Sequence, residues 1–192
     1  MKALAINGSP RSNGNTAILI NRVLAELEKE GIQTELIQLG GKKISGCIAC
    51  YKCFDSKNGR CAQGDDCANE LIGKMRDADA IILGSPTYFA DCTAATKALM
   101  ERAGFVARAG GDLFKRKVGA AVVAVRRAGA IHAFDSINHF FTITQMIIVG
   151  SSYWNIGMGR EKGEVEKDQE GIATMDTLGK NIAWVLKKLH QK

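Results

Sequence analysis

Five short apolar segments, separated by stretches with helical periodicity, constrain the fold of this chain most strongly. The strand-like segments are 2–7, 33–39, 79–84, 118–125 and 146–150. The last three are continuous runs rich in Ile and Val, typical of strands covered on both faces, whereas 33–39 alternates and is expected at a sheet edge. The helix-like stretches are 15–30, 93–102, 132–144 and 172–189. This alternation predicts an α/β fold: a three-layer, doubly wound domain around a parallel five-stranded sheet.

The size and composition of the chain limit the class of protein. Its 192 residues predict a single domain, 1–192, that buries roughly 70% of the surface of the unfolded chain. Hydrophobic residues make up 46% and charged residues 24%, which excludes a disordered or collagen-like chain. No apolar run approaches the roughly 20 residues needed to cross a bilayer, and the apolar N-terminus is too short for a signal peptide. We therefore expect a cytoplasmic protein without a membrane partner, whose six cysteines stay reduced.

The basic charge balance favours anionic partners. The formal net charge is +6, from 26 Lys and Arg against 20 Asp and Glu. A phosphorylated cofactor, an acidic protein or a nucleic acid would each suit this charge. Because no basic block is interleaved with aromatic residues, no nucleic-acid partner is expected.

The only two prolines, Pro10 and Pro86, stand in two Gly-Ser-Pro turns, each directly behind a strand-like segment. In the first turn, glycines let the backbone approach an anion, and the following helix presents free N–H groups under a favourable dipole, so this loop suits a phosphate. Arg11 would add a charge-assisted contact. The small polar residues of the loop are Ser9, Ser12, Asn13, Asn15 and Thr16. A plain N-capped turn is the alternative, although a cap needs only one such residue.

Aromatic residues follow the second Gly-Ser-Pro turn, at the same edge of the sheet. Tyr88 and Phe89 at a strand end suit a flat ring lying over them better than a place in the core, and Pro86 fixes the backbone that enters this loop. Two further loops, 126–129 and 151–154, supply a cationic and a polar-aromatic edge. A phosphate at the first loop and a planar ring at the others together describe a mononucleotide such as FMN.

Two other nucleotide-binding patterns are not expected to function here. No G-x-x-x-x-G-K-[ST] motif occurs, so a Walker-type NTPase is not predicted. Gly157 and Gly159 begin a glycine pattern, but it follows the last predicted strand and leads into charged residues, so we expect no cofactor role for it.

A loop at about 40–67 contains the one metal-binding pattern. Three cysteines follow C-x2-C-x2-C spacing and can face one cluster, and a fourth from farther along would complete the four thiolates of a [4Fe-4S] site. The ligands would be Cys47, Cys50, Cys53 and Cys61. Cys67 stands near the start of a helix, and Cys92 lies beside the aromatic loop with a packing role, so neither is expected among the ligands. A zinc site, a redox dithiol and a metal-free loop stay open, although structural zinc usually pairs two separated C-x2-C knuckles.

Several of these motifs, in this order, resemble the flavodoxin-like NAD(P)H-dependent FMN reductase superfamily, and within it the iron-sulfur flavoproteins. They are GSPRSNGNT at 8–16, GSPTYFAD at 84–91, VRRAG at 125–129 and GSSYWN at 150–155. The resemblance covers nearly the whole chain and implies a flavodoxin-like sheet of order 2-1-3-4-5. The compact cysteine pattern, with its short gap before the fourth cysteine, also resembles that of the iron-sulfur flavoproteins.

The resemblance also implies roles for individual residues. The first loop would hold the FMN phosphate, the second would lie beside the isoalloxazine ring, and the loop after the fourth strand would close over the ring. The residues given a cofactor-binding role are Ser9, Arg11, Ser12, Asn13, Asn15, Thr16, Pro86, Thr87, Tyr88, Phe89, Arg126, Arg127, Ala128 and Gly129. Because members of this superfamily are commonly dimers or tetramers, a homodimer or homotetramer is expected.

The function expected from these observations is electron transfer through FMN. The leading hypothesis is an NAD(P)H-dependent FMN reductase-like oxidoreductase that passes electrons from NAD(P)H, or from a reduced protein such as ferredoxin, to an acceptor. The flavin performs this chemistry, so no catalytic side chain is required. The first alternative is an iron-sulfur flavoprotein that carries electrons between FMN and a [4Fe-4S] cluster without small-molecule turnover. The second is a flavin-binding module that senses redox state.

Overall fold

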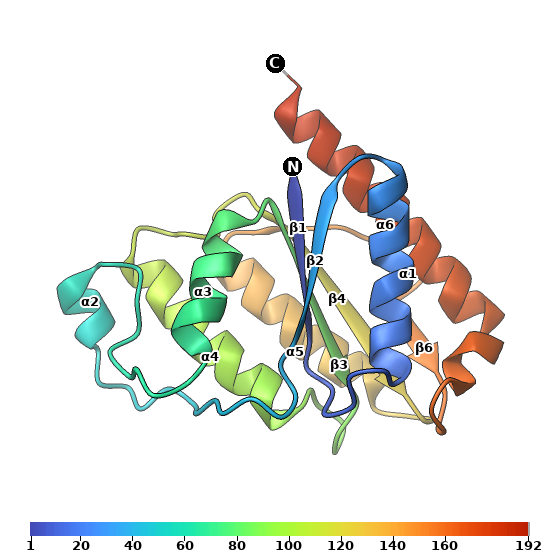
Figure 1. The fold of residues 1–192 in the computed structure, drawn as a ribbon, viewed down its shortest axis with the longest axis horizontal. Coiled ribbons are helices and arrows are strands. Elements are labelled where there is room, and N and C mark those ends of the chain that lie inside the picture. The colour runs from blue at the N-terminus through green and yellow to red at the C-terminus, as the bar shows by residue number, and fades with distance from the viewer. Residues whose placement is uncertain (192) are drawn as a thin grey trace.

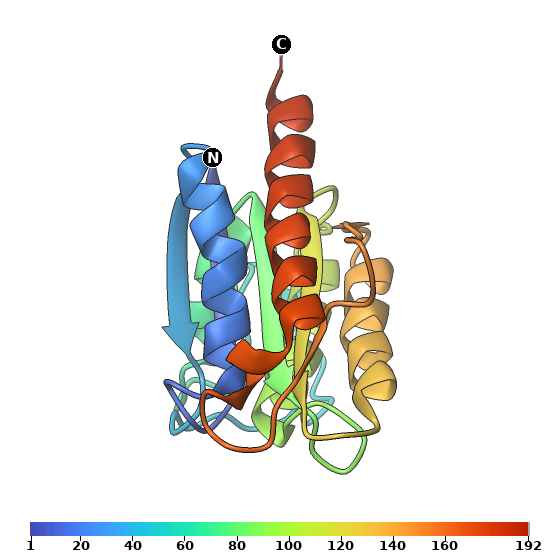
Figure 2. The same cartoon turned by 90° about the vertical axis from the view of Figure 1, so that its right-hand side faces the viewer.

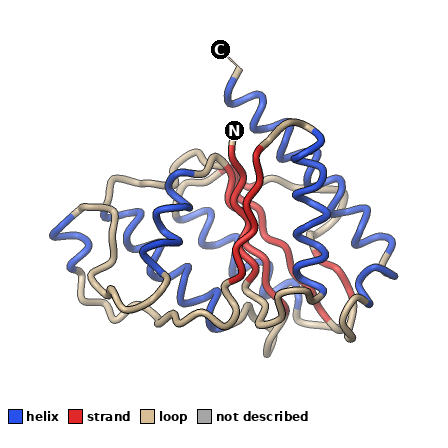
Figure 3. The backbone as a smooth tube through the Cα atoms, in the orientation of Figure 1, coloured by secondary structure: helices blue, strands red, loops and turns tan. Residues whose placement is uncertain are grey.

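A parallel sheet forms the centre of the computed structural model, which describes residues 1–191 (Figures 1 and 3). Its strand order is β2-β1-β3-β4-β5, and β6 also pairs with β4. All of these pairs are parallel. The strands are β1 (Lys2–Asn7), β2 (Gln33–Gln38), β3 (Ala80–Pro86), β4 (Val118–Val125), β5 (Ile147–Ile148) and β6 (Ile156–Met158). This order confirms the flavodoxin-like topology that the sequence motifs imply.

Helices cover both faces of the sheet, as predicted for a three-layer fold. They are α1 (Asn15–Lys29), α2 (Lys52–Ser56), α3 (Ala68–Asp77), α4 (Ala94–Ala109), α5 (Ala130–Ile143) and α6 (Gln169–His190), with a short 3-10 helix at Glu164–Lys167. One face carries α1 and α6, and the other carries α3, α4 and α5 (Figures 1 and 2). None of the helices within residues 1–191 is both long and apolar enough to cross a bilayer.

The core consists of two hydrophobic layers, one on each face of the sheet, and β1 contributes to both. Ala3 and Ala5 pack under α1 and α6, whereas Leu4 and Ile6 pack on the side of α3, α4 and α5. This alternation follows from the two-residue period of a strand. All eight residues of β4 are buried, as a strand covered on both faces requires.

The predicted fifth strand, 146–150, is wrong in its extent. Only Ile147–Ile148 forms β5, which pairs with the beginning of β4 at Val118 and Gly119. The chain then leaves the sheet and returns as β6, which pairs with the end of β4. The fifth position of the sheet is therefore shared by two short strands. The sequence prediction missed β6 because its three residues contain Gly157 and give no apolar run.

Candidate functional site

The two Gly-Ser-Pro turns lie side by side where β1 and β3 end. The N–H of Gly8 donates to the carbonyl oxygen of Gly84 over 2.7 Å. Thr93, which precedes α4, connects both turns: its hydroxyl donates to the Gly8 carbonyl at 2.8 Å, and its N–H donates to the Ser85 hydroxyl at 2.9 Å. A side chain on Gly8 would collide with Thr96, so this close approach requires glycine. The two turns consequently form one edge of a shared site.

Side chains of neighbouring strands fix the shape of the first loop. The buried Asn7 accepts a hydrogen bond from the Ser9 N–H at 3.1 Å and donates to Gln38 on β2 at 2.7 Å. Gln38 in turn donates to the Ser9 carbonyl at 2.6 Å. The Arg11 N–H donates to the Ser9 hydroxyl at 3.1 Å. These hydrogen bonds within the protein hold the loop in place without a ligand. The supporting roles of Asn7 and Gln38 are not evident from the sequence motif.

Helix α1 begins directly after this loop with an uncapped N-terminus. Its N-cap residue is Gly14, and within residues 1–191 no side chain caps this helix. The interpretation of the loop as a plain N-capped turn is therefore not supported. Free N–H groups at a helix start, together with the helix dipole, form a site suited to an anion. Thr16, in the first turn of the helix, is 1% exposed and lines the cavity next to this N-terminus.

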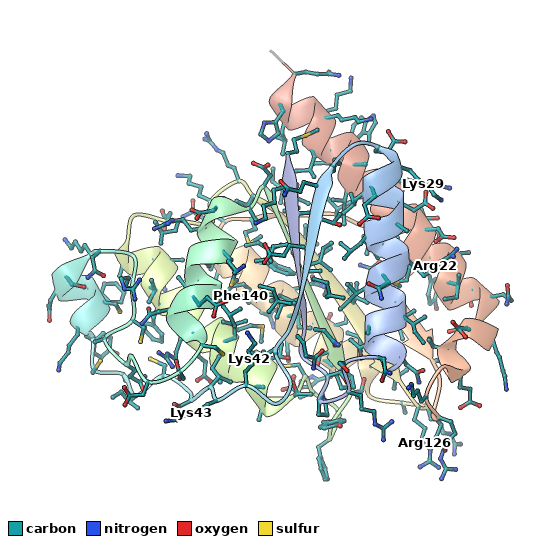
Figure 4. All side chains as sticks on the ribbon, viewed as in Figure 1. Arg22, Lys29, Lys42, Lys43, Arg126 and Phe140 are labelled. Atoms are coloured by element: carbon teal, nitrogen blue, oxygen red, sulfur yellow. The ribbon has the colours of Figure 1, made fainter. Side chains whose placement is uncertain are left out.

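A cavity of about 220 Å³ joins this helix start to the end of β3 and to the loop after β4. Arg126 of that loop lies at the end of the molecule where the strands terminate (Figure 4). The cavity brings together eight residues expected to bind the cofactor: Ser9, Arg11, Asn15, Thr16, Pro86, Thr87, Tyr88 and Arg126. The structure places the other six outside its lining: Ser12, Asn13, Phe89, Arg127, Ala128 and Gly129.

Two of the residues outside the lining, Phe89 and Gly129, lie where the aromatic turn meets the loop after β4. Tyr88 and Asp91 close a tight turn through two mutual backbone hydrogen bonds of 2.8 and 3.0 Å, and Phe89 at its tip is fully exposed. Gly129, with a φ of 84°, precedes α5 and packs against this turn, because a Cβ there would come within 3.0 Å of the Ala90 Cα. The loop after β4 thus contacts the aromatic turn, and its closure over a bound ring stays a prediction.

The side chain of Asn15 hydrogen-bonds the backbone of the loop that follows β6. Its amide nitrogen donates to the carbonyl oxygens of Gly159 and Glu161 at 3.0 and 2.9 Å, and its amide oxygen accepts from the Gly163 N–H at 2.8 Å. The side-chain N–H groups of Asn15 are therefore already engaged, and only its backbone N–H remains for an anion. The bonds hold the loop after β6 against the cavity, with Arg160 in the lining.

Gly159, for which the sequence predicted no cofactor role, lies at the edge of the same cavity. Gly159 lines the cavity, and a Cβ there would lie 2.5 Å from the Val165 nitrogen and 2.9 Å from the Asn15 side chain. The signal that could have identified it was the glycine pattern itself. Because β6 was not predicted, that pattern was not recognised as the end of a strand.

The predicted polar-aromatic edge at 151–154 lies elsewhere. Tyr153 and Trp154 pack against each other with ring centroids 4.8 Å apart, and both are more than half exposed. They lie in the loop that connects β5 to β6. Neither residue lines the cavity described above.

The residues present fit a flavin mononucleotide. Thr87 has a buried hydroxyl oxygen with no hydrogen-bond partner among the described residues, although it lies beside the cavity. A buried polar atom of this kind is costly unless a ligand satisfies it. The cavity lining also contains three arginines, Arg11, Arg126 and Arg160, which suit a phosphate dianion.

Thr87→Val tests this fit. In the protein without flavin, removing a hydroxyl that has no partner should leave the melting temperature unchanged or slightly raised. Flavin affinity should fall by about 1 kcal/mol, or roughly fivefold, because one hydrogen bond is lost. Thr93→Val is the control, since its hydroxyl bonds Gly8 and its loss should lower the melting temperature. Equal flavin affinity in Thr87→Val and wild type would contradict the fit.

A second, small cavity lies between α4 and the loop that carries α2, the helix that projects at the left of Figure 1. The cysteines lining it are Cys47, Cys50, Cys53 and Cys61. Cys67 and Cys92 lie outside the lining, and all six cysteines are free thiols. Burial and the neighbouring Asp91 raise the pKa of Cys92 to about 12, which makes it an unreactive core thiol. Within residues 1–191, no three His, Cys, Asp or Glu side chains form a group arranged to hold a metal ion.

Contacts with α3 and α4 position the cysteine loop. Asn69 of α3 accepts from the Cys61 N–H at 2.7 Å and donates to its carbonyl at 3.0 Å. Glu101 of α4 accepts from the Cys47 N–H at 3.3 Å. Three aromatic rings cover the outside of the pocket, those of Tyr51, Phe54 and Phe105, with centroids 6.1 to 6.3 Å apart.

The sheet order and the cavity at the strand ends define a flavodoxin-like protein whose cavity suits a mononucleotide. Comparison with known proteins supplies the family. The model of the NADPH-dependent FMN reductase family matches residues 1–161, and the chain belongs to this family. FMN-dependent oxidoreductase chemistry follows from that membership.

Relatives and solved structures agree with this assignment. An iron-sulfur flavoprotein of Methanocaldococcus jannaschii is 40% identical over 97% of this chain and 98% of its own. Another, from Methanosarcina thermophila, is 32% identical over 100% of this chain and 98% of its own. The crystal structure of RosB with bound 8-demethyl-8-formylriboflavin-5'-phosphate superposes with a TM-score of 0.78 at 21% identity, over 98% of this chain and 80% of that one. A flavodoxin from the domain Archaea gives 0.64 at 16% identity, over 97% and 99%. At these identities the structures show the fold alone.

Proposed function

We propose that this protein is an FMN-dependent oxidoreductase that also binds a [4Fe-4S] cluster, and that it passes electrons from NAD(P)H or a reduced protein donor to an acceptor. The observation that carries this proposal is the grouping of the four spaced cysteines, and of no other cysteine, around one pocket. The relatives at 40% and 32% identity are named iron-sulfur flavoproteins, which supports the same function.

The first loop and the start of α1 would hold the FMN phosphate. Arg11 supplies a positive charge, the backbone N–H groups of the first helical turn supply donors, and the Thr16 hydroxyl lies among them. Pro86, Thr87 and Tyr88 would lie beside the ring. When bound, FMN supplies hydride and single-electron chemistry, so the protein needs only to bind, orient and shield it.

The cysteine pocket suits a cluster better than a single ion. In a [4Fe-4S] site each of the four thiolates binds a different iron, so the sulfur atoms need not converge on one point. Four cysteines that share the lining of one cavity match this requirement. A zinc site would need four ligands in a tight tetrahedron.

The electron-carrier alternative is favoured by the surface around α2. Ile48 and Tyr51 are 65% and 58% exposed beside the cysteine pocket. Exposed charged residues flank them, and most are basic: Lys52, Lys57 and Arg60 against Asp55. An apolar centre with a basic rim suits a brief encounter with an acidic electron-transfer protein such as ferredoxin. The expected homodimer or homotetramer stays a prediction, to be measured by sedimentation.

Anaerobic stopped-flow spectroscopy tests the proposed function. An oxidoreductase that uses NAD(P)H should bleach its flavin absorbance on mixing with NADH or NADPH and turn over with an added acceptor. A carrier should stay oxidised with both nucleotides and bleach only with a reduced acidic protein. Failure of every donor to reduce bound flavin would contradict both forms of the proposal.

A further inference from the structure

Arg102 of α4 has a fully buried guanidinium whose hydrogen bonds all go to the cysteine loop. Its Nε donates to the Cys61 sulfur at 3.3 Å. One terminal nitrogen donates to the Ser45 carbonyl at 3.4 Å and to the Asp66 carboxylate. The other donates to the Gln63 carbonyl at 2.7 Å. The predicted helix ended at this residue, and nothing in the local sequence indicated such a role.

Asp66 completes a buried ion pair with Arg102. Its side chain is only 3% exposed. Burial opposes its ionisation, but hydrogen bonds from the Ser45 and Ala68 N–H groups and from the guanidinium outweigh this and hold the pKa of the carboxyl below its usual range. Asp66 therefore carries a negative charge inside the protein. The pair anchors both ends of the loop segment that contains Cys61.

Anchoring alone does not explain the bond from Arg102 to sulfur. A neutral thiol is a weak acceptor, whereas a thiolate is a strong one for a charged donor. The Arg102 Nε is fully desolvated, so it has no water with which to replace a poor partner. The Nε–H of Arg102 is thus directed at a sulfur that would bind iron, and a bond to a charged ligand sulfur would offset the cost of burying this donor.

We propose that Arg102 is a positioning residue that raises the reduction potential of the cluster through the Cys61 thiolate, with Asp66 limiting the increase. This inference rests on the proposed function, since it requires the cluster. Reduction adds one electron and one negative charge to the cluster, with no bond made or broken and no proton taken up. A buried positive charge on a ligand sulfur stabilises the more negative, reduced state. Asp66 has no hydrogen bond to the sulfur, so its opposing effect is smaller.

The two partners of the ion pair should therefore shift the potential in opposite directions. Arg102→Gln removes the positive charge and should lower the potential. At a fixed solution potential, we expect the ratio of reduced to oxidised cluster to be at least tenfold smaller than in wild type, which corresponds to a shift of about 59 mV for one electron. Asp66→Asn removes the negative charge, keeps Arg102 and should raise the potential.

Two further variants make the comparison decisive. The double variant, Arg102→Gln with Asp66→Asn, leaves no unpaired buried charge, so its fold should be preserved. Its reduction potential should still lie below that of wild type. Arg108→Gln removes an exposed arginine from the same helix and should leave the potential unchanged. Each protein is purified anaerobically, assayed for iron, and titrated with dithionite and mediators while the reduced cluster is followed by electron paramagnetic resonance.

The outcomes separate this inference from the function beneath it. The tuning role is supported if Arg102→Gln lowers the reduction potential and Asp66→Asn raises it. It is also supported if the double variant has a lowered potential and Asp66→Asn a raised one. If the variants bind iron and keep the wild-type potential, the tuning role is wrong but the proposed cluster stands. The same holds if every ion-pair variant loses its iron, because Arg102 would then only anchor the loop. Absence of iron from wild type overturns both the tuning role and the proposed cluster.

Discussion

Cys50→Ser is expected to remove most of the iron from anaerobically purified protein, whereas Cys92→Ser retains it. Wild type should contain about four irons and four labile sulfides per chain, the composition of one [4Fe-4S] cluster. Cys50 lines the cysteine pocket and its serine variant cannot supply the thiolate. Cys92 is buried in the core, and its raised pKa of about 12 keeps it a thiol. Chemical assays of iron and sulfide, with the visible absorption spectrum, measure the difference.

Cys67→Ser is the sharper control, because Cys67 is the next cysteine in the sequence after Cys61 and lies outside the lining of the pocket. Its N–H donates to the Lys43 carbonyl at 3.2 Å, and burial raises the pKa of its thiol. This variant should keep its iron, and all three serine variants should keep FMN, which binds at other loops. Iron loss in Cys67→Ser with retention in Cys50→Ser would reassign the ligands. A wild type without iron would leave a plain FMN-dependent oxidoreductase whose cysteine loop is structural or redox-active.

The regular part of the fold was predictable because it depends on local patterns. The bounds of β1 and β4 agree with the sequence prediction, since each is a short apolar run between polar turns. The split between β5 and β6 was not predictable in this way. Which residues continue the sheet edge is decided by pairing with β4, far away in the sequence, and not by the composition of the segment itself. Helix α4 extends to Ala109, beyond the predicted end at 102, because its second half packs against α5 and the cysteine loop.

The candidate site was predictable where one loop supplies several contacts. The first loop and the end of β3 were found from their glycines, hydroxyls and prolines, and the structure brings Ser9, Thr16 and Thr87 to one cavity. The residues that hold these loops were missed. Gln38 and Arg102 act through side chains that reach over long sequence separations, and no spacing rule marks such contacts in a single sequence.

Helix α4 connects the two candidate sites. Thr93, its N-cap, bonds both Gly-Ser-Pro turns, and Thr96 packs against Gly8. Two turns further along, Glu101 and Arg102 hold the cysteine loop. One rigid element thus positions the flavin loops and the cysteine pocket together. Substitutions at the N-terminus of α4 are therefore expected to disturb both, whereas those in the cysteine loop affect only the pocket.

Replacing Arg11 by Ala and Thr16 by Val together should weaken FMN binding by about 2 to 4 kcal/mol, which raises the dissociation constant about 30- to 700-fold. The change removes one charged and one neutral donor beside the uncapped N-terminus of α1, where the phosphate is expected. Valine keeps the shape of the buried Thr16, so the apoprotein should melt within a few degrees of wild type.

The matched control is Arg22→Ala with Thr177→Val, which removes the same two chemical groups from α1 and α6, away from the flavin cavity. Arg22 pairs there with Asp176, and neither Arg22 nor Thr177 lines the flavin cavity. Titration of each apoprotein with FMN, followed by quenching of flavin fluorescence, gives the dissociation constants, and repeating it with riboflavin isolates the phosphate. The first-loop variant should bind riboflavin as wild type does, because riboflavin lacks the phosphate that the removed donors contact. If FMN affinity falls no further than in the surface control, the phosphate is bound elsewhere and the uncapped helix start is not its site.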